Sequence, residues 1–278
     1  MEAVVVNSII MLGVTGLIFG MVLGFAAKKF AVKIDEKEEA LLALLPGVNC
    51  GACGYPGCSG YAAALSKGEA PAGKCTVASA DAQQKIQGVL GLEAGEPVKK
   101  VAIIKCAGGE KCKDKMVYTG IKDCRIATGV FGGNKECTWG CLGFGNCAAA
   151  CPFGAITYTE GQVPQIDAVK CTGCGLCVAA CPKNIITLVP CKYHYHVLCA
   201  SQDKGALVRT ICPVGCIGCG ICVKVCPEKD IVLENNVARI KYENCTNCGV
   251  CFHKCPTKSI QKKKSSISQE VAVPKKAG

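Results

Sequence analysis

The sequence predicts an α+β protein that consists of an N-terminal transmembrane helix, a small helical domain and two small cysteine-rich modules. Three observations predict this arrangement. An uncharged apolar segment fills residues 3–27, a glycine-rich run of cysteines follows at 50–75, and a cysteine–proline pattern recurs between 171 and 256. The 278 residues leave room for several such units, because modules of this kind are small and are stabilised by bound metal more than by a large apolar core.

The cysteine–proline pattern begins at Cys171, Cys216 and Cys245, and each copy reads C-x-x-C-x-x-C-x-x-x-C-P. This spacing is typical of bacterial proteins that bind cubane iron–sulfur clusters. With 26 cysteines, a disulfide scaffold is one alternative, but disulfide-dense proteins are short and secreted. Structural zinc sites pair two C-x-x-C units and lack the third close cysteine with its Cys-Pro. The pattern therefore predicts iron–sulfur clusters, which carry single electrons.

The apolar segment Ala3–Ala27 is long enough to span a bilayer as a helix. A cleaved signal peptide is the alternative, but such peptides begin with a basic region, whereas this sequence begins with Met-Glu and carries its lysines after the segment. By the positive-inside rule we expect an uncleaved, single-pass anchor in the plasma (inner) membrane, with the clusters on the cytoplasmic side. The lysines are Lys28, Lys29 and Lys33.

Glycine recurs every four residues within this segment, at Gly16, Gly20 and Gly24. Such a stripe lets a second transmembrane helix approach closely, so it predicts packing against an integral membrane partner. The alternative is that these are ordinary glycines, which membrane helices tolerate well.

The glycine-rich run after the anchor lies between two expected helices, at residues 36–45 and 79–90. Pro46-Gly47 ends the first helix, and Ser79 is expected to cap the second. Glycines let such a loop curl tightly and point its N–H groups at cluster sulfurs. We predict that this loop holds one 4Fe–4S cluster, cluster 1, through Cys50, Cys53, Cys58 and Cys75.

The C-terminal part of the chain contains an internal duplication. The cysteine run that starts at Cys137 aligns at five positions with the run that starts at Cys212, but Phe144 occupies the place of one cysteine. Because cysteines also precede both runs at similar places, residues ~101–188 and ~191–262 are expected to be two related units. A short β-hairpin is expected after each Cys-Pro, at 155–166 and at 231–240.

Three further ligand sets follow from the repeated motif. In two-cluster ferredoxins the fourth cysteine of each run ligates the cluster of the other run. The predicted sets are Cys171, Cys174, Cys177 and Cys151 for cluster 3; Cys216, Cys219, Cys222 and Cys255 for cluster 4; and Cys245, Cys248, Cys251 and Cys226 for cluster 5.

Cluster 2 departs from this rule because Phe144 stands where a ligand is needed. Cys137 lies seven residues earlier, and a longer glycine-containing loop brings it in. The predicted set is therefore Cys137, Cys141, Cys147 and Cys181. The alternatives are a 3Fe–4S cluster at this site or a fourth ligand from Cys106, Cys112 or Cys124.

Five 4Fe–4S clusters use four cysteines each and leave six of the 26 unassigned. We interpret these as buried free thiols, since free cysteine is commonly buried. A sixth cluster held by Cys106, Cys112, Cys124 and Cys137 is the alternative. The six unassigned residues are Cys106, Cys112, Cys124, Cys191, Cys199 and Cys212.

The net charge of +11 does not indicate a nucleic-acid partner. Each oxidised cubane with four thiolates carries roughly −2, which offsets most of the basic excess. Aromatic residues are also sparse, unlike in single-strand-binding surfaces. The sequence has no G-x-G-x-x-G after a strand, no P-loop and no haem attachment motif, and we interpret His194 and His196 as a solvated pair. We therefore predict no nucleic-acid binding and no complete active site in this chain.

The glycine-containing anchor, the N-C-G-A-C-G-Y-P-G-C motif at 49–58, and the run Cys137-x3-Cys141-x5-Cys147-x3-Cys151-Pro together resemble the B-type subunit of the Rnf complex. The resemblance covers essentially the whole chain. It implies a subunit of an ion-translocating ferredoxin:NAD+ oxidoreductase, which passes electrons from reduced ferredoxin to NAD+ and couples this transfer to export of Na+ or H+. It also supports the four cysteines assigned to cluster 1 as one site.

The resemblance also implies partners: soluble ferredoxin, integral membrane subunits of the Rnf complex, and subunits that bind NAD and flavin. Two competing hypotheses are an electron-wire subunit of another membrane enzyme, such as a hydrogenase or a molybdenum reductase, and a non-redox zinc protein.

These predictions divide the chain into seven segments. They are a transmembrane anchor at 1–27, a single 4Fe–4S cluster domain at 28–98, a linker or small β region with extra cysteines at 99–135, a first bacterial-ferredoxin-like module for two 4Fe–4S clusters at 136–190, a linking insert at 191–210, a second such module at 211–262, and a disordered basic tail at 263–278.

Overall fold

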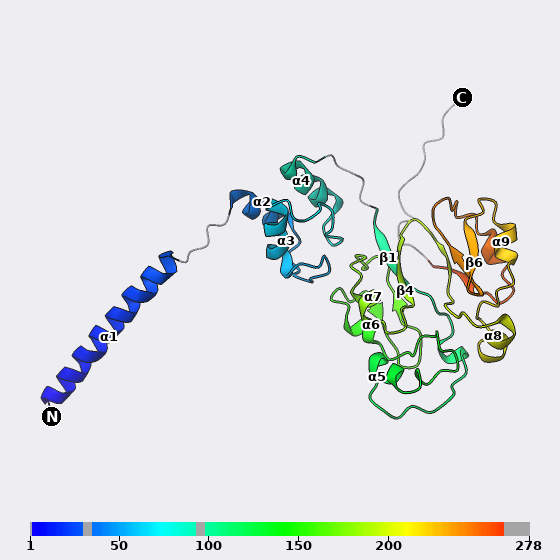
Figure 1. The fold of residues 1–278 in the computed structure, drawn as a ribbon, viewed down its shortest axis with the longest axis horizontal. Coiled ribbons are helices and arrows are strands. Elements are labelled where there is room, and N and C mark those ends of the chain that lie inside the picture. The colour runs from blue at the N-terminus through cyan, green and yellow to red at the C-terminus, as the bar shows by residue number, and fades with distance from the viewer. Residues whose placement is uncertain (1, 30–34, 93–97, 264–278) are drawn as a thin grey trace.

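The computed structural model describes residues 2–29, 35–92 and 98–263, so Lys33 and nearly all of the predicted tail lie outside the described residues. The chain begins with the apolar helix α1 (Glu2–Lys29), drawn in blue in Figure 1. Among the described residues it is the one helix long and apolar enough to cross a membrane, over Val6–Lys29. At 1.5 Å per residue this span is about 36 Å long, which exceeds a hydrocarbon core of ~30 Å.

The glycine stripe of α1 faces open space. A Cβ atom added at Gly16, Gly20 or Gly24 would meet no atom of the described residues within 4 Å. The stripe is therefore free to lie against another helix, and its role stays a prediction.

A helical domain follows the anchor, and it consists of α2 (Glu36–Leu44), α3 (Gly57–Ser66) and α4 (Ala80–Leu90). Its core is formed by Leu41, Tyr61, Leu65 and Ile86, each at most 2% exposed. The predicted cap of α4 is confirmed, because the Ser79 hydroxyl accepts a hydrogen bond from the backbone N–H of Ala82 at 3.2 Å.

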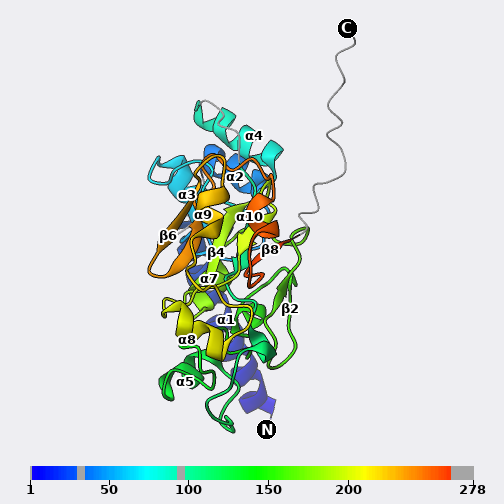
Figure 2. The ribbon, with the colours of Figure 1, turned by 90° about the vertical axis from the view of Figure 1, so that its right-hand side faces the viewer.

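The rest of the described chain is a topological repeat of small antiparallel β ladders (Figures 1 and 2). In each unit an outer pair joins the first strand to the last, and a hairpin lies between them in the sequence. The same strand order in both units confirms the predicted duplication. The first unit contains β1 (Lys100–Ile104) paired with β4 (Ile186–Pro190) and β2 (Ile156–Thr157) paired with β3 (Gln165–Ile166); the second contains β5 (Tyr195–Val197) paired with β8 (Ile260–Lys262) and β6 (Ile231–Glu234) paired with β7 (Val237–Ile240).

The outer pairs change where the two units begin. Strand β1 lies in the segment expected to be a linker, and β5 lies in the expected linking insert, yet both form ladders with the last strand of their unit. The predicted starts at 136 and 211 therefore omit one strand each. Cysteine spacing could not show this, because the paired strands are far apart in the sequence.

Short helices position the cysteines. Helices α6, α7, α9 and α10 each follow a glycine with positive φ and carry the third cysteine of their run in the first turn. The described helices of the two units are η1 (Gly109–Lys111), α5 (Cys124–Gly129), α6 (Asn146–Ala149), α7 (Leu176–Ala180), α8 (Gly205–Ile211), α9 (Ile221–Val225) and α10 (Val250–His253).

We expect Gly173→Ala to destabilise the first unit by more than about 3 kcal/mol, because a Cβ atom there is both strained and obstructed. Gly173 has φ +70°, and its Cβ would lie 2.4 Å from the backbone oxygen of Lys100 in β1. Gly175→Ala is the matched control: its φ is +84°, but its nearest contact is Leu188 at 3.8 Å, so only the strain of about 1–2 kcal/mol remains. Urea unfolding followed by cluster absorbance measures both, and equal shifts would contradict the close approach to β1.

Candidate iron–sulfur centres

The four cysteines assigned to cluster 3 line one small cavity of about 20 Å3, and they are Cys151, Cys171, Cys174 and Cys177. Burial, followed by the neighbouring thiols, raises the pKa of Cys177 to about 12. Strand β1 closes the site, since the N–H of Ala102 donates to the Cys171 sulfur at 3.5 Å. Four buried thiols ionise together only if a cation compensates their charge, so this donor set fits a cubane.

The second unit contains two such groups. Burial raises the pKa of Cys222 to about 11, and the thiols of Cys216, Cys219 and Cys255 add to this rise. Burial likewise raises the pKa of Cys251 to about 11, with a further rise from Cys248, Cys245 and Cys226. In each group the fourth cysteine thus comes from the other run, which is the ligand exchange typical of two-cluster ferredoxins.

These two groups differ from the others in their exposure. Cys219 and Cys248 are exposed, and they are the only exposed cysteines among the 26, all of which lie in the described residues. The second unit therefore presents cluster ligands at the protein surface.

The single-cluster loop brings Cys53, Cys58 and Cys75 together against the helical core. Burial raises the pKa of Cys75, and the thiols of Cys53 and Cys58 add to this effect. Cys50 is half-buried in the same loop. Its neighbour Asn49 ties the loop to α3, because the Asn49 Oδ1 accepts the backbone N–H of Cys58 at 2.8 Å.

A fourth cysteine for cluster 2 comes from a place that sequence reasoning left among the alternatives. Cys124, Cys141, Cys147 and Cys181 line one cavity of about 30 Å3. Burial, then the Cys124 and Cys181 thiols, raise the pKa of Cys147 to about 11.

Asn146 positions Cys124 beside Cys147. Its Oδ1 accepts the backbone N–H of Cys124 at 2.8 Å, and its Nδ2 donates to the Asp123 carboxylate at 2.7 Å. These bonds join the start of α5 to the start of α6. The sequence signal was the Asp-Cys pair that opens a helix, but its partner is 22 residues away.

The structure does not place Cys137 with the cluster 2 group, where the sequence analysis expected it. Cys137 lines a different cavity, together with Cys106, Cys112 and Cys212. The reason is the backbone: the N–H of Glu136 donates to the carbonyl of Lys113 at 2.8 Å and holds Cys137 beside Cys112. Phe144 is 7% exposed and packs on Tyr118 with ring centroids 5.5 Å apart.

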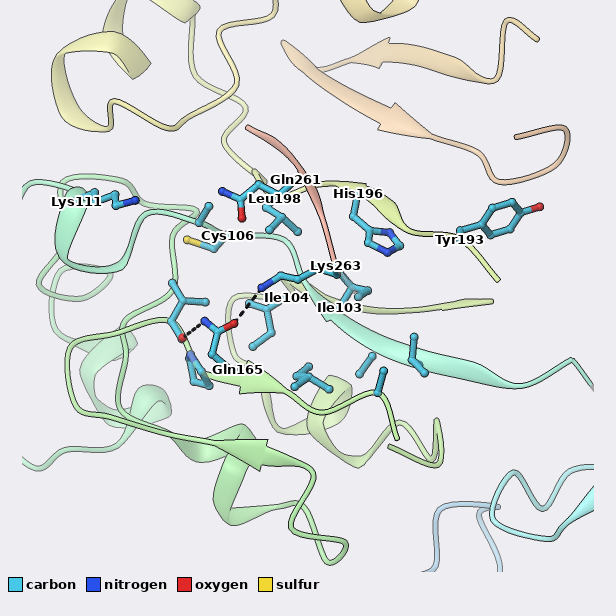
Figure 3. Close-up of a pocket in the computed structure, with 17 residues that line it drawn as sticks. Ile103, Ile104, Cys106, Lys111, Gln165, Tyr193, His196, Leu198, Gln261 and Lys263 are labelled. Carbon is cyan, nitrogen blue, oxygen red and sulfur yellow. Dashed lines mark hydrogen bonds between the residues drawn. The ribbon is translucent and has the colours of Figure 1, made fainter. Parts of the chain in front are cut away.

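The interpretation of His194 and His196 as a solvated pair is wrong for His196, which is only 2% exposed. Figure 3 shows it at the wall of a cavity of about 510 Å3, across from β1, where Lys263 also donates to the Gln165 side chain at 2.9 Å. The His196 Nδ1 lies 2.7 Å from the Tyr242 hydroxyl. Burial lowers the pKa of His196 to about 4, so its ring is neutral at pH 7.

His196 makes the second unit sensitive to acid. Its pKa is about 4 in the folded protein and about 6.5 when unfolded, so the unfolded state binds the extra proton between these values. Stability is therefore highest above pH 6.5 and falls as the pH drops towards 4, by on the order of 3 kcal/mol. We expect His196→Asn, which keeps a polar atom near Tyr242, to lose this slope in urea midpoints measured from pH 7 to pH 5. An unchanged slope would assign the acid sensitivity to other groups.

Comparisons with known proteins identify three iron–sulfur regions. Residues 45–77 match a domain described as a putative Fe-S cluster domain, and residues 136–185 and 209–256 each match a 4Fe-4S dicluster domain. These matches confirm iron–sulfur clusters as the cofactor class.

Three relatives, each the B-type subunit of its complex, align with most of the chain. The one from the Na(+)-translocating ferredoxin:NAD(+) oxidoreductase complex of Acetobacterium woodii is 45% identical over 84% of this chain and 70% of its own length. The one from the proton-translocating ferredoxin:NAD(+) oxidoreductase complex of Clostridium ljungdahlii is 41% identical over 84% and 83%. The one from the ion-translocating oxidoreductase complex of Methanosarcina acetivorans is 39% identical over 77% and 81%.

This chain belongs to the family of B-type subunits of ion-translocating oxidoreductase complexes. The family predicted from the cysteine motifs is thereby confirmed. As a family member with matched iron–sulfur domains, the chain is an electron-transfer subunit of a translocating oxidoreductase.

Proposed function

We propose that this chain accepts electrons from reduced ferredoxin and relays them, within a membrane complex, towards reduction of NAD+ coupled to translocation of Na+ or H+. The observation that carries the proposal is the 41–45% identity to two subunits whose names specify ferredoxin, NAD(+) and a translocated cation. Iron–sulfur cubanes supply reversible uptake of one electron without bond cleavage. The chain itself contributes the thiols, the N–H donors and the burial that tune such centres.

The proposed ligand sets for clusters 1, 3, 4 and 5 are those predicted from the sequence. For cluster 2 we propose Cys124 in place of Cys137, because Cys124 shares a cavity with Cys141, Cys147 and Cys181. We also propose that the two ferredoxin-like modules begin at their first strands, and therefore span residues 100–190 and 195–262.

Helix α1 is proposed to be a single-pass anchor, with the clusters on the cytoplasmic side. Lys28 and Lys29 form the basic end of this helix, which supports that orientation. The proposed partners are integral membrane subunits beside α1, soluble ferredoxin at the cluster-bearing part, and subunits that bind flavin and NAD.

The second unit is the proposed acceptor for ferredoxin electrons, because it exposes the cluster ligands Cys219 and Cys248. Helices α9 and α10 pack together and carry the exposed lysines Lys224 and Lys254. Ferredoxins are usually acidic, so these charges would steer the encounter.

Stopped-flow mixing of reduced ferredoxin with the full chain, loaded with iron under anaerobic conditions in detergent, tests the proposal. We expect bleaching of cluster absorbance that saturates with ferredoxin and slows with salt, and a smaller salt dependence in the Lys224→Gln/Lys254→Gln variant. Lys37→Gln, at an exposed position in α2, is the control. No transfer to a protein that dithionite still reduces would overturn the proposal and favour an electron wire for another membrane enzyme.

A further inference from the structure

Five cysteines outside the proposed ligand sets gather where the two units meet. They line a single small cavity between η1, the loop before Cys141, and helix α8. The sixth unassigned cysteine, Cys191, lies in the core of the first unit instead. The five are Cys106, Cys112, Cys137, Cys199 and Cys212.

One residue of the backbone draws three of these thiols together. The N–H of Lys113 donates to the carbonyl of Ile211 at 2.9 Å, and its carbonyl accepts the N–H of Glu136 at 2.8 Å. Each of these three residues is next in sequence to a cysteine. The Cys112 thiol is hydrogen-bonded to both Cys137 and Cys212 as a result.

Cys106 completes a set of four. A Cβ atom at Gly108 would lie 3.3 Å from the Cys212 sulfur, 3.7 Å from the Cys106 sulfur and 3.2 Å from the Cys112 Cβ. A glycine at this position therefore lets three of the cysteines surround one point. The Cys106 sulfur also accepts the N–H of Cys141 at 3.5 Å, which is the kind of N–H to sulfur bond that cluster ligands receive.

The cavity resembles the proposed cluster sites in size. It measures about 20 Å3, against about 20 Å3 for the cluster 3 site and about 30 Å3 for the cluster 2 site. In none of the described parts of the chain do three Cys, His, Asp or Glu side chains converge closely enough for a single ion, and this holds for the ferredoxin motifs as well. The spacing therefore favours a cubane over zinc.

We propose that Cys106, Cys112, Cys137 and Cys212 hold a sixth 4Fe–4S cluster between the two ferredoxin-like modules. Lys135, which is 4% exposed and paired with Asp114 at 3.0 Å, supplies a buried positive charge near Cys112 that favours four thiolates. Cys199 is outside the set because its sulfur accepts the N–H of Cys216 and it lies beside Cys106 alone among the four.

The position of this site gives it a role that rests on the proposed function. Cys106 is hydrogen-bonded to the cluster 2 ligand Cys141, and Cys212 lies four residues before the cluster 4 ligand Cys216. The site thus lies between a centre of each module. In each transfer the donor centre is oxidised by one electron and the acceptor centre is reduced by one, and no atom moves. Electrons received by the second unit would reach the first by this route.

Iron and sulfide analysis of the full chain in detergent, reconstituted anaerobically, tests the proposal. With four irons per cubane, we expect about 24 irons per wild-type chain and about 20 in Cys112→Ser. Cys199→Ser and Cys191→Ser are matched controls at buried or half-buried cysteines and should keep the wild-type count. A wild-type count of about 20 irons would overturn the sixth site and leave the proposed function standing, whereas a protein without iron would refute both.

Zinc analysis and a second variant guard against a false result. About one zinc per chain that disappears in Cys112→Ser would show a zinc site in place of the cluster. If Cys112→Ser fails to fold, Cys212→Ser replaces it, and native mass spectrometry of the wild-type chain counts clusters without any substitution. A wild-type mass that corresponds to five cubanes under these conditions would overturn the proposal.

Discussion

Cys124→Ser is expected to remove about four irons per chain, because Cys124 supplies one of the four thiolates of cluster 2. The substitution changes one atom, and the hydrogen bonds of Asn146 to the Cys124 backbone and to Asp123 remain possible. The rest of the first unit should therefore keep its fold. The measurement is the iron and sulfide content of the purified chain, together with the intensity of the reduced-cluster EPR signals.

A double variant decides whether Cys124 and Cys137 serve the same centre. If they belong to two clusters, Cys124→Ser and Cys137→Ser should each lose about four irons, and the double variant about eight. If both bind one cluster, the double variant should lose no more than either single variant. Cys191→Ser, at a buried cysteine in the core of the same unit, controls for the loss of a buried thiol.

Local spacing explains how much of these sites the sequence reveals. In the runs that begin at Cys171, Cys216 and Cys245, three ligands lie within seven residues of chain, so their proximity follows from the motif. The same holds for the hairpins after each Cys-Pro and for the cap at Ser79, which depend on neighbouring residues.

Contacts between distant segments explain the rest. Cys124 reaches Cys147 through the side chain of Asn146, and Cys112 reaches Cys212 through a backbone bond between Lys113 and Ile211. Neither bond leaves a periodic pattern in the sequence, because each joins one residue to one partner far along the chain. The outer strands β1 and β5 were missed for the same reason.

Removal of residues 1–29 is expected to release the chain from the membrane while its iron content stays unchanged. The described side chains of α1 from Val6 onward are almost all exposed, so the large apolar surface of this helix is covered by nothing else in the described residues. Burial of a single large apolar side chain contributes about 1.5–3 kcal/mol, so a whole span provides essentially irreversible attachment. The measurement is the distribution of the chain between membrane pellet and supernatant, with iron determined in each.

The result depends on whether the partner subunits are present, and this dependence separates two kinds of attachment. Expressed alone, the truncated chain should be found in the supernatant; if it stays in the pellet, the cysteine-rich part binds the membrane itself. Expressed with the complex, a truncated chain that stays bound would show docking through its cluster-bearing units. The Gly16→Leu/Gly20→Leu variant completes the test: α1 keeps its length and apolar surface, so it should stay in the membrane. Loss of this variant from the purified complex alone would assign the glycine stripe to a contact with a partner helix.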